Sequence, residues 1–176
     1  MSFTESNLNP GGFGPGDTEW IHLIIGEWQI IADIAQSDLV VWFPTDYVVA
    51  DGSGPDSVSA IAHVRPSNVH TLFHHDIVDH TMDDNICDEA RKSWHTQKIV
   101  HHVMEAGPSM RPGVKVTFVP IVRNSRTIAL LSMHTIPTVV RASSQAEEIY
   151  NWVTENMLEM IHLGIWPDPL AQENNT

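Results

Sequence analysis

The chain has 176 residues, a length typical of one domain with a substantial core, and 42% of them are hydrophobic. Its 22 acidic residues against nine basic ones give a formal net charge of −13, which argues against nucleic acid or an anionic membrane as a partner. The single cysteine excludes an internal disulfide framework, and no apolar run approaches the roughly 20 residues of a membrane span. The composition therefore predicts a cytoplasmic globular domain.

The N-terminal part of the chain is expected to pass from disorder into a helix and then a strand. Residues 1–16 are rich in Gly, Pro and Asn, lack the features of a secretory signal and predict a disordered lead-in. A helical pattern begins at Asp17, the expected N-cap. Apolar residues recur along it at three- and four-residue intervals: Ile21, Ile24, Ile25, Trp28, Ala32 and Ala35. Near Ser37 the period changes, and residues 38–44, DLVVWFP, predict a buried strand.

The middle of the chain predicts further short elements. Residues 57–66 alternate weakly between apolar and polar and indicate a second strand, and residues 69–76, VHTLFHHD, indicate a third. Asp84 is expected to cap a short helix with apolar residues at four-residue intervals. Residues 98–105, KIVHHVME, predict another strand.

The clearest elements are a hairpin and a last helix. Residues 113–135, GVKVTFVPIVRNSRTIALLSMHT, read as two paired strands, and residues 128–131 are apolar on both faces, as in a central strand. The last helix begins at Ser144 with Glu147 three residues on, which is the spacing of a capping box. Gly164 fits the left-handed position after the helix. The stripe expected to face the core is Ile149, Val153, Met157, Met160 and Ile161.

These elements predict an α+β fold. It should contain an antiparallel sheet of about five to six strands, with the hairpin near its centre. The N- and C-terminal helices both carry an apolar stripe, and we expect them to pack on one face of that sheet.

The chain lacks the common catalytic motifs. It contains no GxxxxGK[ST], GxSxG, HExxH or CxxC, and no GxGxxG after a strand. Cys87 lies on a short amphipathic helix and is expected to be a packed thiol rather than a nucleophile. We therefore assign no catalytic residue and expect no enzymatic activity of this chain.

Histidine is the one residue type that suggests a ligand pocket. The candidates among the 11 histidines are His74, His75, His80, His101 and His102. Adjacent residues on a strand point to opposite faces, so each His-His pair offers only one ligand per face. A site would have to be assembled across strands, and scattered surface histidines are the alternative. We assign no metal ligand.

Four apolar side chains are candidates for a dimer interface: Trp28, Tyr150, Trp152 and Leu158. Tyr150, Trp152 and Leu158 lie off the expected stripe of the last helix, so one face cannot bury all of that helix's apolar residues. A homodimer joined as a helical bundle would cover the excess. The alternative is that these side chains fold back on the domain's own sheet.

Several stretches together resemble a known family. They are GEWQIIADIAQSDLVVW at residues 26–42, HHDIVDH at 74–80, VPIVRNSRTIALLSMHT at 119–135 and the closing GIWPD at 164–168. They are similar to the N-terminal GAF domain of actinobacterial sensor histidine kinases of the PdtaS type. The resemblance implies a GAF-like sensor domain at residues 17–168 and the start of a linker at 169–176. Relatives commonly have Gly in place of Asp79 and Arg-Glu in place of His101-His102.

The resemblance also implies a function. It indicates the sensory input domain of a cytosolic two-component histidine kinase that signals as a homodimer to downstream PAS and kinase domains of the same chain. A cognate response regulator would be the partner of the full-length kinase. No cofactor is expected here, because ATP would be used by the kinase domain. The alternative is a sensor that binds a small molecule or a metal through the histidine cluster.

Overall fold

The computed structural model describes residues 2–3, 14, 16–45, 55, 57–69, 72–104, 113–137 and 144–167. One antiparallel sheet contains six strands in the order β1-β3-β2-β6-β5-β4. The strands are β1 (Ser2–Phe3), β2 (Asp38–Pro44), β3 (Val58–Val64), β4 (Val100–Met104), β5 (Val114–Arg123) and β6 (Arg126–Thr135). The helices are α1 (Asp17–Glu27), α2 (Gln29–Ala35), α3 (Asp84–Thr96) and α4 (Gln145–His162). The predicted α+β class, the sheet and its central hairpin are confirmed.

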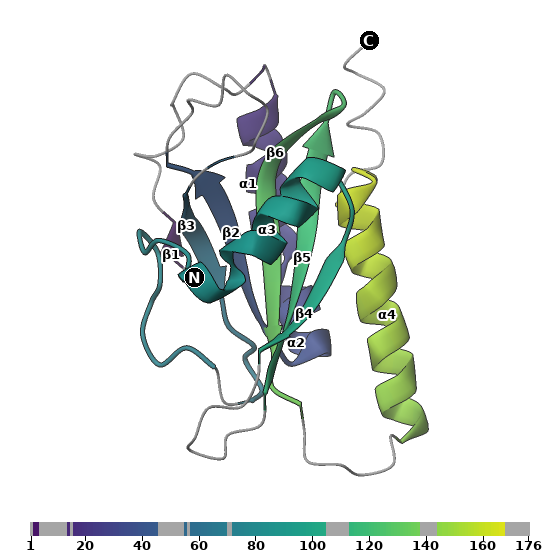
Figure 1. Ribbon diagram of the computed structural model, residues 1–176. Helices are drawn as coiled ribbons and strands as arrows, with labels where there is room; N and C mark the ends of the chain where they lie inside the picture. The colour runs from purple at the N-terminus through teal and green to yellow at the C-terminus, as the bar shows by residue number, and fades with distance from the viewer. Residues whose placement is uncertain are drawn as a thin grey trace.

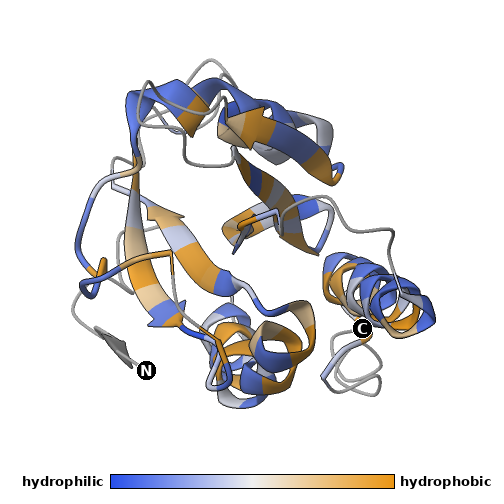
Figure 2. Cartoon of the chain, turned by 90° about the horizontal axis from the view of Figure 1, so that it is seen from below, coloured by the Kyte–Doolittle hydropathy of each residue, from blue (hydrophilic) through white to orange (hydrophobic). Residues whose placement is uncertain are grey.

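Helices cover both faces of the sheet. Helices α1 and α2 lie behind it, α3 crosses its front, and α4 runs beside β5 and β4 (Figure 1). Viewed from below, the largely apolar strands separate these helix layers (Figure 2). One core cluster joins Trp20, Ile24 and Trp28 of the first helices to Leu158 and Ile161 of α4 and to one face of the sheet. The first and last helices thus share a face, as predicted.

A second core lies between the sheet and α3. It contains Val40 and Trp42 of β2, Phe118 of β5 and Leu130 of β6, with Ile86 of α3 packed against them. Because alternate residues of β2 face the two cores, every residue of that strand is buried. This explains why residues 38–44 read as a continuous apolar run rather than an alternating one.

The start of α1 differs from the prediction. Gly16, with φ 79°, is the N-cap, and Asp17 is the first helical residue and is completely buried. Its carboxylate is paired with Arg126 and lies 3.6 Å from Arg123 Nε, while Arg123 Nη1 donates to the Gly16 carbonyl oxygen at 2.9 Å. We call Asp17, Arg123 and Arg126 the Asp17 clasp. It fastens the start of α1 to the β5–β6 turn.

The third strand predicted at residues 69–76 is wrong for the part that is described. Residues 72–76 form bends in the loop between β3 and α3, and residues 70–71 lie outside the described residues. Carboxylate side chains accept two of the backbone donors in the first part of this loop. Ser67 N donates to Asp33 Oδ1 at 2.6 Å, and Leu72 N donates to Asp38 Oδ2 at 2.7 Å. An apolar-rich segment anchored in this way resembles a strand in sequence.

The ends of α4 are as predicted, but its buried face is not. The capping box is present, with Glu147 N donating to Ser144 Oγ at 3.2 Å, and Gly164 adopts φ 68° after the helix. The buried residues, however, are Thr154, Leu158 and Ile161, whereas Ile149 is 53% exposed. Both faces of α4 carry apolar residues at helical spacing. The predicted stripe therefore combined residues of the buried face with residues of the exposed face.

Gly113 allows the backbones of β4 and β5 to approach closely. An ideal Cβ at Gly113 would lie 2.5 Å from the Met104 carbonyl oxygen, and backbone cannot move aside as a flexible side chain can. We expect Gly113→Ala to lower the free energy of unfolding in urea by about 1–3 kcal/mol. Gly26→Ala is the control, because nothing lies within 4 Å of that Cβ and alanine favours the helix interior. Equal losses in the two variants would contradict this prediction.

Candidate functional site

A group of buried polar side chains lies on the face of the sheet that α3 covers. Asp38 on β2 pairs in register with His134 on β6, and Val40 pairs with His63 on β3. Since side chains alternate along a strand, Asp38 shares the face of Val40 and Trp42, as Ser132 and His134 do on β6. We call Asp38, Trp42, His63, Ser132 and His134 the polar cluster. Each of them is at most 4% exposed.

Two sets of hydrogen bonds connect the polar cluster. Asp38 Oδ1 lies 3.2 Å from His63 Nε2, and its second oxygen accepts from Leu72 N of the loop. Trp42 Nε1 donates to Ser132 Oγ at 2.6 Å, and this hydroxyl lies 2.8 Å from His134 Nε2. The cluster therefore holds a carboxylate, two imidazoles, a hydroxyl and an indole within three adjacent strands.

The two histidines differ in their electrostatic environment. Burial lowers the pKa of His134 from 6.5 to about 4, with Asp38 raising the pKa and His63 lowering it to smaller extents. The His134 imidazole is therefore neutral near pH 7. His63 lies between two carboxylates, because Asp76 Oδ1 is 3.9 Å from its Nδ1 on the side away from Asp38 Oδ1.

Phe73 closes the polar cluster from the loop side. Its ring stands edge-on to His63, with centroids 5.4 Å apart and an interplanar angle of 89°. It stands edge-on to His134 as well, at 5.0 Å and 76°. Phe73 is half-buried and also packs against the second core. One aromatic ring of the loop thus contacts both buried imidazoles.

The histidines singled out in the sequence do not form a joint site in the structure. His74, His75, His80 and His101 are exposed and His102 is half-buried. His101 and His102 are successive residues of the edge strand β4, and His101 Nδ1 lies 3.1 Å from Thr117 Oγ1. Desolvation and the nearby Lys115 lower the pKa of His101. Across the described ranges, no three His, Cys, Asp or Glu side chains are placed to hold a metal ion.

Sequence reasoning missed His63 and His134 for an identifiable reason. The His-His doublets, which are the conspicuous histidine pattern in the sequence, lie in a loop and on an edge strand. His63 and His134 instead interrupt the apolar strands SVSAIAHV and IALLSMHT. An isolated polar residue inside a strand expected to be buried was the available signal, because such a group needs a specific partner.

The dimer-interface candidates divide into two pairs. Trp28 and Leu158 are 0% and 2% exposed and belong to the core around α1, so they offer no surface to a partner. This corrects their assignment. Tyr150 and Trp152 are 54% and 66% exposed, and they remain interface candidates.

Other large apolar residues on or next to the helices are also exposed. Leu23 of α1, Ile30 of α2, Ile149 of α4 and Leu163, the residue after α4, are each between 42% and 53% exposed. We call these four residues and Trp152 the helical face. A groove of about 310 Å³ lies between the first helices and the end of α4. Its lining residues are Leu23, Glu27, Ile30, Met157, Trp166 and Pro167.

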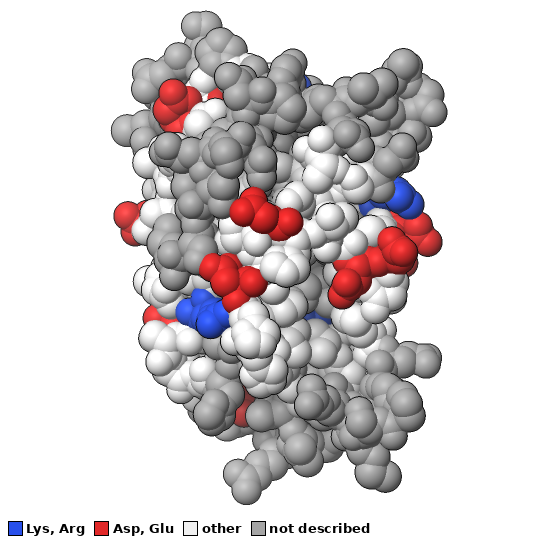
Figure 3. All heavy atoms as spheres, turned by 90° about the vertical axis from the view of Figure 1, so that its left-hand side faces the viewer, with Lys and Arg blue, Asp and Glu red and all other residues white. Residues whose placement is uncertain are grey.

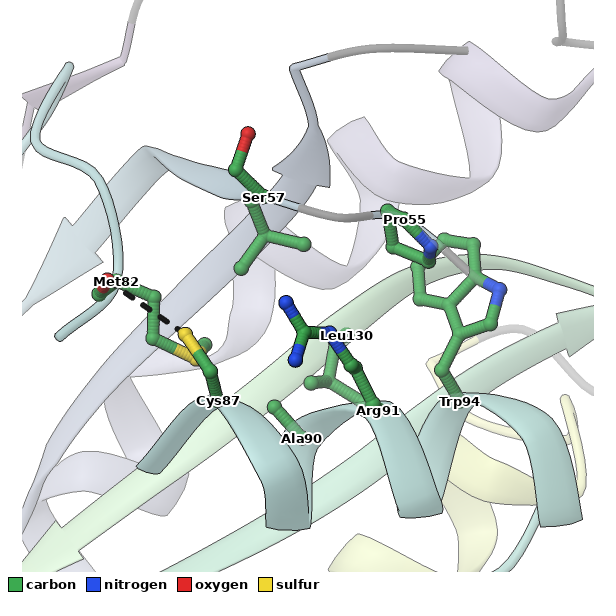
Figure 4. Close-up of a pocket in the computed structure, with 9 residues that line it drawn as sticks. Pro55, Ser57, Met82, Cys87, Ala90, Arg91, Trp94 and Leu130 are labelled. Carbon is green, nitrogen blue, oxygen red and sulfur yellow. Dashed lines mark hydrogen bonds between the residues drawn. The ribbon is translucent and has the colours of Figure 1, made fainter. Parts of the chain in front are cut away.

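A narrow crevice under α3 contains the cysteine (Figure 4). Met82, Ala90, Trp94 and Leu130 line it, and its free volume of about 10 Å³ holds hardly more than one water molecule. Cys87 Sγ lies 3.7 Å from the Met82 carbonyl oxygen, and burial raises the pKa of the thiol. Both observations fit the expected packed thiol, because a raised pKa disfavours the reactive thiolate.

The face of the molecule beside β1 and β3 carries more acidic than basic side chains among the described residues (Figure 3). Figure 3 shows acidic side chains scattered over the face beside β1 and β3, with few basic ones among them. This distribution agrees with the net charge of −13. Among the described helices, none combines the length and apolar character that crossing a membrane requires.

Comparisons with known proteins agree with this architecture. Residues 9–154 match the family described as "Histidine kinase PdtaS, GAF domain". The chain is 25% identical over 157 residues to the sensor histidine kinase PdtaS of Mycolicibacterium smegmatis, and 25% identical over 158 residues to PdtaS of Mycobacterium tuberculosis. Each match covers 88% of this chain and 30% of the relative, so the chain spans about a third of their length.

A solved structure shows the same fold. It is described as the sensor region of a sensor histidine kinase and superposes with a TM-score of 0.67 at 23% identity. The match covers 96% of this chain and 56% of that chain. With the family match over residues 9–154, the resemblance seen in the sequence is confirmed: this chain belongs to the GAF domain family of PdtaS-type sensor histidine kinases.

Proposed function

We propose that the chain is the sensory input domain of a cytoplasmic two-component histidine kinase and that it signals as a homodimer. Its family and the greater length of its relatives support a position ahead of further domains. PAS and kinase domains, ATP use by the kinase and transfer to a response regulator are the proposed downstream parts. The observation that carries the homodimer is the two-sided character of α4.

The two sides of α4 have separate uses. Thr154, Leu158 and Ile161 bury one side against α2 and the sheet. The opposite side carries Ile149, Val153, Asn156, Met160 and Leu163. Their spacing of four, three, four and three residues is that of a heptad seam, in which each apolar residue enters a hole on a second helix. A central Asn in such a seam favours one register and one oligomeric state.

A second copy of the chain fits this side of the molecule. The 18 residues of α4 extend about 27 Å at 1.5 Å per residue, which provides a long contact. Leu23 of α1 and Ile30 of α2 are also exposed, and they line a groove together with Met157 of α4. Two copies related by a twofold axis would bring the helical face of each against the other. Small rotations of α4 could then pass towards Pro167 and the following domain.

Charged substitutions on the helical face test the homodimer. We expect Trp152→Glu and Leu163→Glu to leave the fold intact and to raise the dissociation constant at least about 100-fold, because a charge would be buried without a partner. Sedimentation velocity over a concentration series measures that constant, and circular dichroism checks the fold. Asn85→Glu is the matched control, because it adds the same charge to exposed surface on α3, on the other side of the sheet. Unchanged association in both helical-face variants would refute the proposal.

A further inference from the structure

We propose that Trp152 of each copy enters a groove on the other copy, and that this exchange sets the two α4 helices parallel. The groove is lined by Leu23, Glu27, Ile30, Met157, Trp166 and Pro167, and we call it the α4 groove. The inference rests on the proposed homodimer, since it names the side chain and the site through which two copies recognise each other.

Trp152 is exposed to an extent that is unusual for its residue type. It is 66% exposed, the highest value of any large apolar residue that the structure describes. Trp20, Trp28 and Trp42, by contrast, are each at most 4% exposed. A tryptophan can bury roughly 150–250 Å² against a partner, and tryptophans that fill a partner's pocket often dominate the affinity of an interface. Trp152 is therefore the strongest candidate for an anchor on α4.

The α4 groove has the size and chemistry to receive an indole ring. Its volume of about 310 Å³ is at the lower end of the roughly 300–1,000 Å³ of pockets that hold small organic molecules. Leu23, Ile30 and Met157 contribute apolar walls. Glu27 contributes an exposed carboxylate, which can accept a hydrogen bond from the indole N–H. The groove therefore offers a place for the apolar ring and for its one donor.

The spacing along α4 brings Trp152 and the groove together only in a parallel pair. With about 100° between successive helical residues, Trp152 lies about 60° to one side of the heptad seam and Met157 about 80° to the other side. These are the g and e positions of a heptad that places Ile149 and Asn156 at d. In a parallel pair, a g residue lies beside the partner's e residue five positions later, and five positions separate Trp152 from Met157. In an antiparallel pair g faces g, so Trp152 would not reach the groove.

Charge also favours an uncharged anchor. Each copy has a formal net charge of −13, so two copies repel each other unless salt screens them. The contact between them must therefore gain its affinity from buried apolar area. A neutral indole ring in a largely apolar groove provides that area without adding charge.

Two single variants disable the two halves of the contact. Trp152→Ala removes the ring and leaves the groove intact, whereas Ile30→Glu puts a charge in the groove wall and leaves the ring intact. The homodimer of either variant has lost both contacts. We expect each dissociation constant to rise at least about 100-fold, because one lost anchor contact is worth at least about tenfold. Sedimentation velocity measures the constants, and circular dichroism checks the fold.

Mixing the two variants shows whether Trp152 and the groove meet across the dimer. In the mixed dimer, Trp152 of the Ile30→Glu chain faces an intact groove, so one contact is restored. The introduced carboxylate faces the shortened side chain of the other copy and stays in water. We therefore expect the mixed dimer to have a dissociation constant at least about tenfold below that of either variant homodimer. Fluorescence-detected sedimentation with one variant labelled at its N-terminus measures that constant.

Leu163→Ala is the matched control for Trp152→Ala. It also removes an exposed apolar side chain from the helical face, but Leu163 belongs to the seam and does not face the groove. A dimer of Leu163→Ala with Ile30→Glu should therefore have a dissociation constant between those of the two homodimers. If Ile30→Glu does not fold, Leu23→Glu in the same groove takes its place.

The outcomes separate this contact from the homodimer itself. A mixed dimer of Trp152→Ala and Ile30→Glu whose constant lies between those of the two homodimers would overturn the contact and leave the homodimer intact. An Ile30→Glu chain that associates as tightly as the unmodified chain would mean that a second copy does not cover the groove. An unmodified chain that stays monomeric would overturn both the homodimer and the contact.

Discussion

Asp17→Ala is expected to lower the free energy of unfolding by about 3 kcal/mol in urea denaturation. Asp17 is completely buried, and Arg123 is only 12% exposed, so removing the carboxylate leaves a largely desolvated guanidinium without this partner. The expected loss is at the lower end for buried pairs because Arg126 is 37% exposed and water can solvate it. The substitution also removes the acceptor of Gly14 N, which lies 2.7 Å from Asp17 Oδ2.

The control for Asp17 lies on the same turn of α1. Glu19 is also acidic but exposed, and Glu19→Ala should change the free energy of unfolding by no more than about 0.5 kcal/mol. Asp17→Asn keeps the shape and one acceptor oxygen but removes the charge and the second acceptor, so its loss should exceed that of Glu19→Ala. A loss for Asp17→Ala as small as that for Glu19→Ala would show that the Asp17 clasp contributes little to stability.

The second large effect is a loss of stability in acid that depends on His134. The pKa of His134 falls from 6.5 to about 4 on folding, so between these values the unfolded chain binds a proton that the folded chain excludes. Its contribution is therefore undiminished above about pH 6.5 and decreases as the pH falls. We expect this proton uptake by the unfolded chain to lower the free energy of unfolding by about 1.4 kcal/mol at pH 5.5 and by about 3 kcal/mol at pH 4.

Comparing pH series isolates this contribution. Urea unfolding of the unmodified chain and of His134→Gln, at pH 7.5, 6.5, 5.5 and 4.5, gives the free energy at each pH. The variant should be less stable at pH 7.5 but should lose less stability on acidification. His74→Gln, which alters an exposed histidine, should keep the slope of the unmodified chain. Equal slopes for His134→Gln and the unmodified chain would contradict the prediction.

The sequence predicted those elements whose signals are local. The β5–β6 hairpin, the capping box at Ser144 and the left-handed Gly164 each depend on residues within a few positions of one another. The inner face of α4 could not be predicted in the same way. Leu158 and Ile149 both fit an apolar stripe, and only contact with α2 and the sheet determines that Leu158 is buried.

The candidate site was harder to predict because it depends on strand register. Asp38, His63 and His134 are far apart in sequence, and only the pairing of β2 with both β3 and β6 brings them onto one face. A shift of one residue in either pairing would turn a histidine to the opposite face. The clasp was missed for the same reason: Asp17 looks like a helix cap until the β5–β6 turn is placed beside it.

Residues of strand β5 form hydrogen bonds with the ends of two different helices. Arg123, at its last position, holds the start of α1 through the Gly16 carbonyl oxygen. Three residues earlier, the Pro120 carbonyl oxygen accepts from His162 Nδ1 at 3.1 Å, at the last residue of α4. The beginning of the first helix and the end of the last are thus fastened to one short stretch of the same strand. A displacement of this stretch would therefore act on both helix ends at once, whereas attachment to separate strands would leave the two ends independent.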